Sequence, residues 1–184
     1  MTDVLLETRD LDVTFDIAKR GAMPWTRPDA LQAVSKANLT VHRGETLGLV
    51  GESGSGKSTL ARAIVGTVRP TGGRVLWKGR DITALKPAER RAHGRHVQMV
   101  FQDPLAALDP RMNVGQIIAE PLKTHRGDLD AKEQRRRVGE MMERVGLLPN
   151  LQNRYPHEFS GGQCQRIGIA RALITEPELV ICDE

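Results

Sequence analysis

The chain is poor in cysteine and in aromatic residues, and it has no long apolar run. Its two cysteines, Cys164 and Cys182, cannot build a disulfide framework or a zinc site by themselves, so we interpret both as small packing residues in a reducing compartment. No apolar run approaches the roughly 20 residues of a membrane-spanning helix, and the N-terminus has no basic stretch or apolar signal core. These absences argue against export and against an integral membrane segment, which makes the cytoplasm the expected compartment.

The excess of charge is also small. The chain has 27 basic and 23 acidic side chains, a formal net charge of +4, which does not indicate a nucleic-acid partner without a clustered face. The densest cluster is Arg135, Arg136 and Arg137, which we expect on the solvated side of a helix. With 184 residues, 39% hydrophobic and 27% charged, the chain is long enough for one globular domain or most of a larger one.

Glycine is concentrated at residues 51–58, which carry a phosphate-binding pattern. Their sequence, Gly-Glu-Ser-Gly-Ser-Gly-Lys-Ser, fits G-x-x-x-x-G-K-[ST] at every fixed position. The apolar residues 45–50 suit a buried strand, and residues 59–65 have helical spacing. Glycines let backbone N–H groups turn inward on phosphates at the positive end of the new helix. The context predicts a nucleotide site in which Lys57 reaches the β- and γ-phosphates and the Ser58 hydroxyl binds Mg²⁺; the alternative is a glycine-rich loop without a ligand.

The rest of the chain predicts a mixture of strands and helices. We expect strands over 5–15, 31–34, 37–41, 45–50, 75–77, 97–101 and 178–182, and helices over 59–65, 87–94, 114–122, 131–145 and 161–173. Residues 18–29 are expected to form a loop. His93 and His96 can share one helical face, but two ligands do not make a closed metal site.

This order of elements predicts an α/β protein with a P-loop NTPase core, an N-terminal antiparallel β part and a helical insert. We expect one domain over residues 1–184. It divides into a β-rich nucleotide-binding core at 1–102, a helical subdomain at 103–160, and a final helix and strand at 161–184.

Three further segments follow the glycine loop in a fixed order. Residues 159–163, Phe-Ser-Gly-Gly-Gln, resemble the signature sequence of ATP-binding cassette (ABC) proteins. Residues 179–184 resemble the apolar strand and acidic pair called Walker B, and Gln102 resembles the glutamine of the Q-loop. The resemblance extends from Leu5 to Glu184 and implies an incomplete ABC cassette that uses ATP and Mg²⁺.

The resemblance also implies roles for individual residues. Asp183, at the end of a stiff strand, would hold Mg²⁺ together with Ser58 and Gln102. Glu184 would polarise the attacking water as general base, and Gln102 would contact both the metal and that water.

Two further groups of residues are expected at the nucleotide. Phe15 resembles the aromatic residue that stacks on adenine, with a core phenylalanine as the alternative. The residues expected to bind ATP are Phe15, Gly51, Glu52, Ser53, Gly54, Ser55, Gly56, Lys57, Ser58 and Thr59. A helix start suits an anion, and the resemblance implies that the anion at Ser160, Gly161, Gly162 and Gln163 is the γ-phosphate of the ATP held by a partner subunit.

Shorter segments resemble one branch of the family, the ATPase subunits of bacterial oligopeptide, dipeptide and nickel importers. They are residues 48–53, 102–104, 108–112 and 155–159. In that branch the stretch after Gln102 receives the coupling helix of the membrane subunit. Four apolar residues there are candidates for the edge of a docking groove, or alternatively for the insert's own core. They are Leu108, Pro110, Met112 and Val114.

This resemblance implies an ATP-hydrolysing subunit that drives uptake of peptides or a related solute. It would lie peripherally on the cytoplasmic face of the inner (plasma) membrane. Its partners would be a second ATPase subunit, permease subunits and, indirectly, an external solute-binding protein, with no nucleic acid. One alternative is a cassette ATPase that acts on DNA, which the lack of sustained heptads between Leu60 and Phe159 disfavours, or on ribosomes, which the length of the chain disfavours. The other is an inert nucleotide-binding fragment.

Two features depart from the family pattern. The residue after Gln163 is commonly a cation in these importers but is Cys164 here, which removes a charge near the helix start. In the family a loop, a strand and a histidine that senses the γ-phosphate follow the acidic pair. We therefore expect these 184 residues to be a fragment that hydrolyses ATP poorly by itself.

Overall fold

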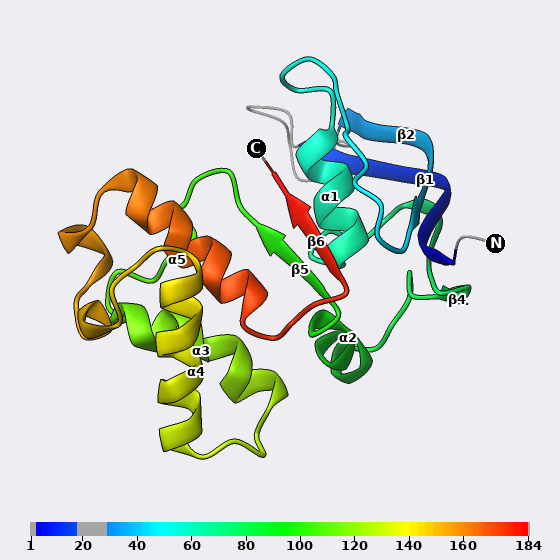
Figure 1. The fold of residues 1–184 in the computed structure, drawn as a ribbon. Coiled ribbons are helices and arrows are strands. Elements are labelled where there is room, and N and C mark those ends of the chain that lie inside the picture. The colour runs from blue at the N-terminus through cyan, green and yellow to red at the C-terminus, as the bar shows by residue number, and fades with distance from the viewer. Residues whose placement is uncertain (1–2, 18–28, 184) are drawn as a thin grey trace, which may run out of the picture. The chain divides into compact units, whose positions relative to one another are not determined.

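A computed structural model describes residues 3–17 and 29–183 of the chain (Figure 1). The chain forms two compact units, Met1–Arg90 and Arg91–Glu184. The expected general base, Glu184, lies outside the described residues. Of the loop expected at 18–29, only Asp29 is described, and it is the first residue of a strand. The expected boundaries after residues 102 and 160 stay a prediction.

The first unit contains an antiparallel sheet with the order β2-β1-β3-β4. Its strands are β1 (Val4–Ile17), β2 (Asp29–His42), β3 (Gly72–Trp77) and β4 (Arg80–Asp81). Leu6, Leu11 and Val13 of β1 and Val75 of β3 are buried, so these two strands supply much of the core of the unit. The two strands expected at 31–34 and 37–41 are one continuous strand, with bulges in its pairing to β1.

Helix α1 (Lys57–Val65) lies against β1 and β2 of this sheet (Figure 1). Leu60, Ala63 and Ile64 recur at helical spacing and are buried. Gly66 ends the helix in the left-handed conformation, where its N–H bonds to the carbonyl oxygens of Arg62 and Ala63. The helix predicted at 59–65 is therefore confirmed and begins two residues earlier, inside the glycine motif.

The strand predicted at residues 45–50 is wrong. These residues form no regular structure, and all six are exposed, with 96% of the surface of Val50 accessible. None of the described strands pairs with them. A strand is stable only where a neighbour satisfies its backbone N–H and C=O groups, and an apolar composition does not supply that neighbour.

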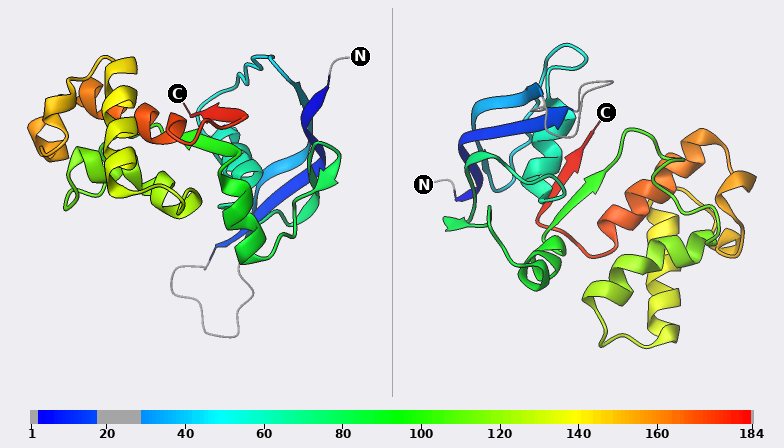
Figure 2. Two further views of the ribbon diagram at one scale, coloured as in Figure 1. Left: turned by 60° about the horizontal axis from the view of Figure 1, so that its bottom comes forward. Right: turned by 180° about the vertical axis from the view of Figure 1, so that it is seen from behind.

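The second unit contains a two-stranded parallel sheet of β5 (Val97–Val100) and β6 (Leu179–Cys182), which Figure 2 shows side by side. Helix α2 (Pro87–Gly94) precedes β5 and contains the point where the first unit passes into the second. In the register, Val97 pairs with Leu179 and Val100 pairs with Cys182, so both strands end at the same edge. Cys182 is exposed, and its predicted role as a packing residue is wrong.

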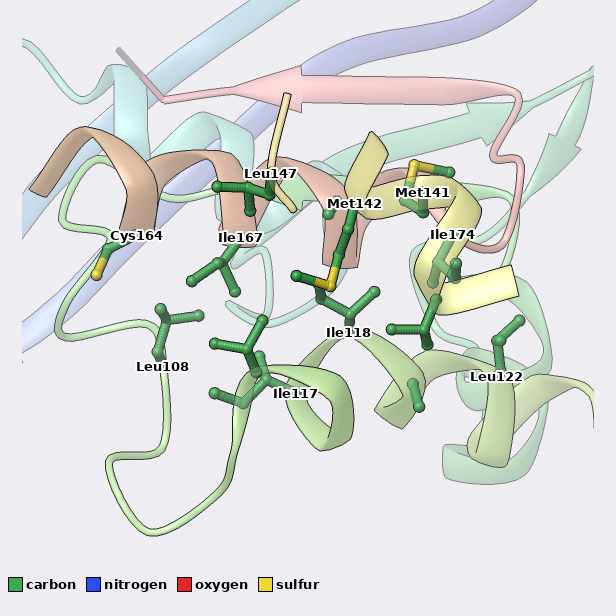
Figure 3. Close-up of a cluster of buried hydrophobic side chains, with 14 residues drawn as sticks. Leu108, Ile117, Ile118, Leu122, Met141, Met142, Leu147, Cys164, Ile167 and Ile174 are labelled. Atoms are coloured by element: carbon green, nitrogen blue, oxygen red, sulfur yellow. The ribbon is translucent and has the colours of Figure 1, made fainter. Parts of the chain in front are cut away.

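Three helices form the main core of the second unit (Figure 3). They are α3 (Val114–His125), α4 (Ala131–Arg144) and α5 (Gly161–Leu173); two short 3₁₀ helices, η1 (Pro149–Leu151) and η2 (Pro156–Glu158), lie in the connection between α4 and α5. Ile118 of α3, Met142 of α4 and Ile167 of α5 are almost fully buried and meet in this core. Each helix places an apolar stripe at 3.6-residue spacing towards the other two, which explains why they fold together.

The helical core also decides between the two interpretations of the segment after Gln102. Leu108 is 3% exposed, Val114 is fully buried, and Met112 packs against the same cluster. The three side chains therefore fill the core of their own unit, and only Pro110 of the four candidates is exposed. Within the described residues, no helix combines the length and apolar character needed to span a membrane.

Candidate nucleotide site

The glycine loop closes around the side chain of Lys57. Its ammonium group donates hydrogen bonds of 2.7 Å to the carbonyl oxygens of Gly51 and Glu52. The loop also folds back on itself, because the Ser55 N–H donates to the carbonyl oxygen of Glu52 at 3.2 Å. The cation is thus held by the loop that the motif predicts for phosphate.

The loop ends at Gly56, which begins helix α1 in a conformation that favours glycine. Its φ is +93°, and a Cβ at this position would lie 2.1 Å from the carbonyl oxygen of Ala33 on β2. No side-chain hydrogen bond caps the start of α1, and its first turn contains no acidic residue. The N–H groups and the positive dipole of this helix start therefore face the loop without a competing carboxylate, which suits an anion.

An apolar patch lies on β1 and β2 near the glycine loop. Phe15 pairs with Leu31 across the two strands, and Ile17 is on the same face of β1 as Phe15. Each of the three is between 40% and 52% exposed, so Phe15 is not a core residue. Leu31 is two positions from Ala33, the contact of Gly56, or about 7 Å along the strand. This unit thus places an accessible aromatic ring on β1 and the end of the glycine loop against β2, the strand paired with β1.

Gln102 and Asp183 lie at the carboxyl ends of the two parallel strands of the second unit. Gln102 follows β5 by two residues and is exposed, whereas Asp183 follows β6 directly and is only 9% exposed. The Asp183 N–H donates to the carbonyl oxygen of Val100 at 3.0 Å, which extends the pairing of the strands to this residue. A carboxylate fixed at the carboxyl edge of a parallel sheet has the setting that α/β proteins use for ligands.

The predicted signature residues begin helix α5. The Ser160 hydroxyl oxygen accepts from the Gln163 N–H at 3.3 Å, and the Gln163 side-chain oxygen accepts from the Ser160 N–H at 2.9 Å. This capping box fixes the first turn. Gly161 and Gly162 are exposed, and a Cβ on either would meet nothing within 4 Å. The described part of the chain therefore does not itself require glycine at these positions.

The side chain of Cys164 points into the helical core rather than towards the surface at the helix start (Figure 3). Its thiol donates to the carbonyl oxygen of Pro156 at 3.5 Å, and burial raises its pKa. The predicted packing role of Cys164 is confirmed.

Two other groups singled out in the sequence have structural partners. Arg136 pairs with Glu133 and Glu140 along α4, and Arg137 pairs with Glu133, which confirms the predicted solvated face. His96 contacts Glu178 at 3.1 Å between its Nδ1 and the Oε1 atom. Within residues 3–17 and 29–183, no group of three or more His, Cys, Asp or Glu side chains is arranged to hold a metal ion.

One polar residue close to Gln102 gave no signal in the sequence. Arg171, in the last turn of α5, donates to the carbonyl oxygen of Ala107 at 2.6 Å and lies over the ring of Phe101. An arginine in an amphipathic helix normally predicts an exposed side chain, and its contacts with residues more than 60 positions away are visible only in the fold.

An ATP-binding cassette is defined by three parts: a glycine loop, a signature turn at a helix start such as that at Ser160, and an acidic residue at a strand end such as Asp183. Comparison with known proteins assigns the chain to the same class. Residues 34–184 match the family described as ABC transporter, so the chain belongs to that family.

Among curated proteins, the chain is 59% identical over 98% of its length to the oligopeptide transport ATP-binding protein OppF of Escherichia coli (strain K12). It is 46% identical over 99% of its length to the oligopeptide transport ATP-binding protein AppF of Bacillus subtilis (strain 168). These matches cover 54% and 55% of the two relatives. The chain thus spans about half the length of the curated relatives it matches.

Among solved structures, the fold matches the dimeric structure of a post-hydrolysis state of the ATP-binding cassette MJ0796 bound to ADP and Pi. The TM-score is 0.85 at 28% identity, over 97% of this chain and 73% of that one. A second dimeric structure of MJ0796, described as a bacterial ABC transporter cassette, matches with a TM-score of 0.83 at 29% identity. The predicted α/β cassette fold is confirmed.

Proposed function

We propose that the protein to which this chain belongs is the ATP-hydrolysing subunit of an importer for oligopeptides. The observation that carries the proposal is the Lys57 ammonium group, which the carbonyl oxygens of the glycine loop hold by two hydrogen bonds. The chain is 59% identical to an oligopeptide transport ATP-binding protein. The adenine ring would stack on Phe15, and the triphosphate would lie along residues 51–59.

The glycines at the start of α5 support a second ATPase subunit, the same or a different chain, as partner. Gly161 and Gly162 have ordinary backbone angles and open space where a side chain would be, so the fold of the described chain tolerates alanine at both. Glycine is useful there if another molecule must approach the backbone closely. The solved relative MJ0796 is dimeric and binds ADP and Pi. We infer that the Ser160–Gln163 turn contacts the ATP bound by a second subunit.

Mg²⁺ prefers carboxylate, hydroxyl and phosphate oxygens, and each residue proposed to hold it carries an oxygen group. Asp183 supplies a carboxylate fixed by the pairing of β6, Ser58 supplies a hydroxyl in the first turn of α1, and Gln102 supplies an amide. When bound, Mg²⁺ neutralises charge on the phosphate oxygens. The role of Glu184 as general base stays part of this proposal.

The turn after Gln102 supports a permease as membrane partner. Leu105 is 56% exposed, in contrast to the buried Leu108 three residues later. We propose that the exposed side of residues 103–107, and not the buried residues 108–114, receives a helix of the permease on the cytoplasmic face of the membrane.

The proposal is tested with the full-length protein assembled with its permease in vesicles. Asp183→Asn keeps the size of the side chain and removes its charge, so ATP hydrolysis and peptide uptake should both fall by about a hundredfold or more. Asp109→Asn is the matched control, because Asp109 is paired with Arg111 on the surface, and both rates should stay within about twofold. Normal hydrolysis by the Asp183→Asn protein would contradict the proposal.

A further inference from the structure

Arg171 contacts both ends of the turn that carries Gln102. Its guanidinium carbon lies 6.0 Å from the ring centroid of Phe101, the residue before Gln102. Its Nη1 donates at 2.6 Å to the carbonyl oxygen of Ala107, at the far end of the turn. The guanidinium group of Arg171 therefore connects helix α5 to the residues on both sides of the turn 102–106, Phe101 before it and Ala107 after it.

The turn is a folded piece of backbone in its own right. The Asp103 carboxylate accepts from the N–H groups of Leu105 at 2.9 Å and Ala106 at 3.1 Å. The Ala107 N–H donates to the carbonyl oxygen of Asp103 at 3.2 Å. Because these bonds close the turn on itself, a force on exposed Leu105 reaches Ala107, and the carbonyl of Ala107 is the atom that Arg171 holds.

The other end of α5 is equally well fixed. The capping box of Ser160 and Gln163 sets its first turn, and Ile167 and Ala170 are fully buried among α3 and α4. Arg171 is eleven positions after Ser160 along a continuous helix, which corresponds to about 16 Å. A helix of this length moves as a rigid rod, so a displacement at Arg171 is passed to Ser160.

Arginine is suited to this position because two different contacts are made at once. A guanidinium can lie over an aromatic face while its N–H groups donate hydrogen bonds in its own plane. Burial lowers the pKa of the Arg171 side chain, and the nearby Glu120 opposes that shift. A lysine would supply a charge and one hydrogen bond but no planar surface for Phe101.

We propose that Arg171 is a positioning residue that joins the Gln102 turn to the signature helix, so that both move as one piece during the ATPase cycle. This inference rests on the proposed function, because it assumes that Gln102 and Ser160 act on ATP. It assigns a mechanical link within a single subunit between the surface proposed to receive the permease and the turn proposed to contact the partner's ATP.

The test compares three variants of the full-length protein by steady-state ATP hydrolysis and by amide hydrogen exchange. Arg171→Met removes both contacts and Arg171→Lys removes the stacking surface. Arg166→Met is the matched control, because Arg166 also lies on α5 and donates to a backbone carbonyl, that of Gly146 at 3.2 Å. For both Arg171 variants we expect kcat to fall about tenfold while KM for ATP stays within about twofold. The control should leave both constants within about twofold.

Hydrogen exchange gives a readout that does not depend on activity. In the Arg171→Met protein, amide hydrogen exchange should accelerate at residues 103–108. Addition of ATP should also no longer slow exchange in that segment and in residues 160–163 together. In the control, exchange should accelerate only near residues 145–147. If Arg171→Met unfolds the protein as a whole, Arg171→Lys decides by the same criteria.

A normal kcat in both Arg171 variants, full activity with lysine, or unchanged exchange at 103–108 would overturn the inference. Lys57→Ala in the same assay separates this failure from that of the proposed function. If Lys57→Ala abolishes hydrolysis while the Arg171 variants are normal, only the inference fails. If Lys57→Ala hydrolyses ATP normally, the proposed function fails.

Discussion

The α-carbon of Gly56 faces the carbonyl oxygen of Ala33 so closely that a Cβ would lie 2.1 Å from that oxygen. The close approach places the end of the glycine loop against β2, the strand that also carries Leu31 of the exposed apolar patch. The position of the loop on the first unit thus depends on a missing side chain at one residue.

Gly56→Ala and Gly162→Ala should both impair function but should differ in their effect on stability. At Gly56 the added methyl group overlaps backbone at a φ of +93°, so the free energy of unfolding should fall by more than about 2 kcal/mol and ATP binding should be lost. At Gly162 the methyl group meets open space, so thermal unfolding should not be weakened, whereas hydrolysis by the dimer should fall about tenfold. Thermal unfolding and hydrolysis by the full-length protein check both outcomes. Equal destabilisation by the two variants would show that the open space at Gly162 is occupied.

A cationic side chain at position 164, which the importer pattern favours, is predicted to destabilise this protein. Cys164→Arg places a charge in the buried cluster of α3, α4 and α5, which should cost more than about 3 kcal/mol of stability. Cys164→Ala keeps the site apolar and should cost about 1 kcal/mol. Denaturant unfolding measures both changes. An arginine variant as stable as the alanine variant would mean that the side chain of residue 164 can reach the surface.

The permease-docking surface is tested by two leucines three residues apart. Leu105→Asp changes an exposed side chain, so stability should stay within about 0.5 kcal/mol while capture of the full-length protein by its permease is lost. Leu108→Asp buries a charge in the helical core and should unfold that unit. Leu105→Ala, which shortens the side chain without adding a charge, is the milder control. Normal capture of the Leu105→Asp protein would place the docking surface elsewhere.

Glu133 is predicted to titrate far below its ordinary pKa. Hydrogen bonds from Arg136 and Arg137 lower the pKa of Glu133 from 4.5 to about 2. The ionised carboxylate is favoured in the folded state, so this ion-pair network contributes to stability above about pH 4.5 and its contribution is lost as the pH falls towards 2. Arg136→Met should raise the pKa of Glu133 towards 4.5, as NMR of the side-chain carboxyl would show. An unchanged pKa in this variant would contradict the assigned pairing.

Much of the fold could be predicted from the sequence because its helices and its glycine loop have clear local sequence patterns. The apolar spacing of Val138, Met141 and Met142 predicts α4, and the glycine motif predicts the loop and the helix that follows it. The order of the motifs also predicts the family. These features depend on residues close together in the chain, where periodicity and backbone chemistry decide the outcome.

The features that the sequence did not predict depend on long-range partners. Residues 45–50 have the composition of a buried strand, but none of the described strands pairs with them. Leu108 and Leu105 are chemically identical and differ only in whether α3 and α5 cover them. Arg171 finds Ala107 through the packing of α5 beside the end of β5. No local pattern encodes these contacts.

The most direct test of the central claim is equilibrium binding of ATP to the full-length protein in the presence of Mg²⁺. Lys57 donates charge-assisted hydrogen bonds inside the loop, so Lys57→Ala should weaken ATP binding by at least about thirtyfold. Lys86→Ala, at an exposed lysine of the same unit, should bind ATP like the unchanged protein. If the unchanged protein shows no affinity for ATP, or if Lys57→Ala binds it equally well, the assignment of residues 51–58 as the phosphate site is wrong.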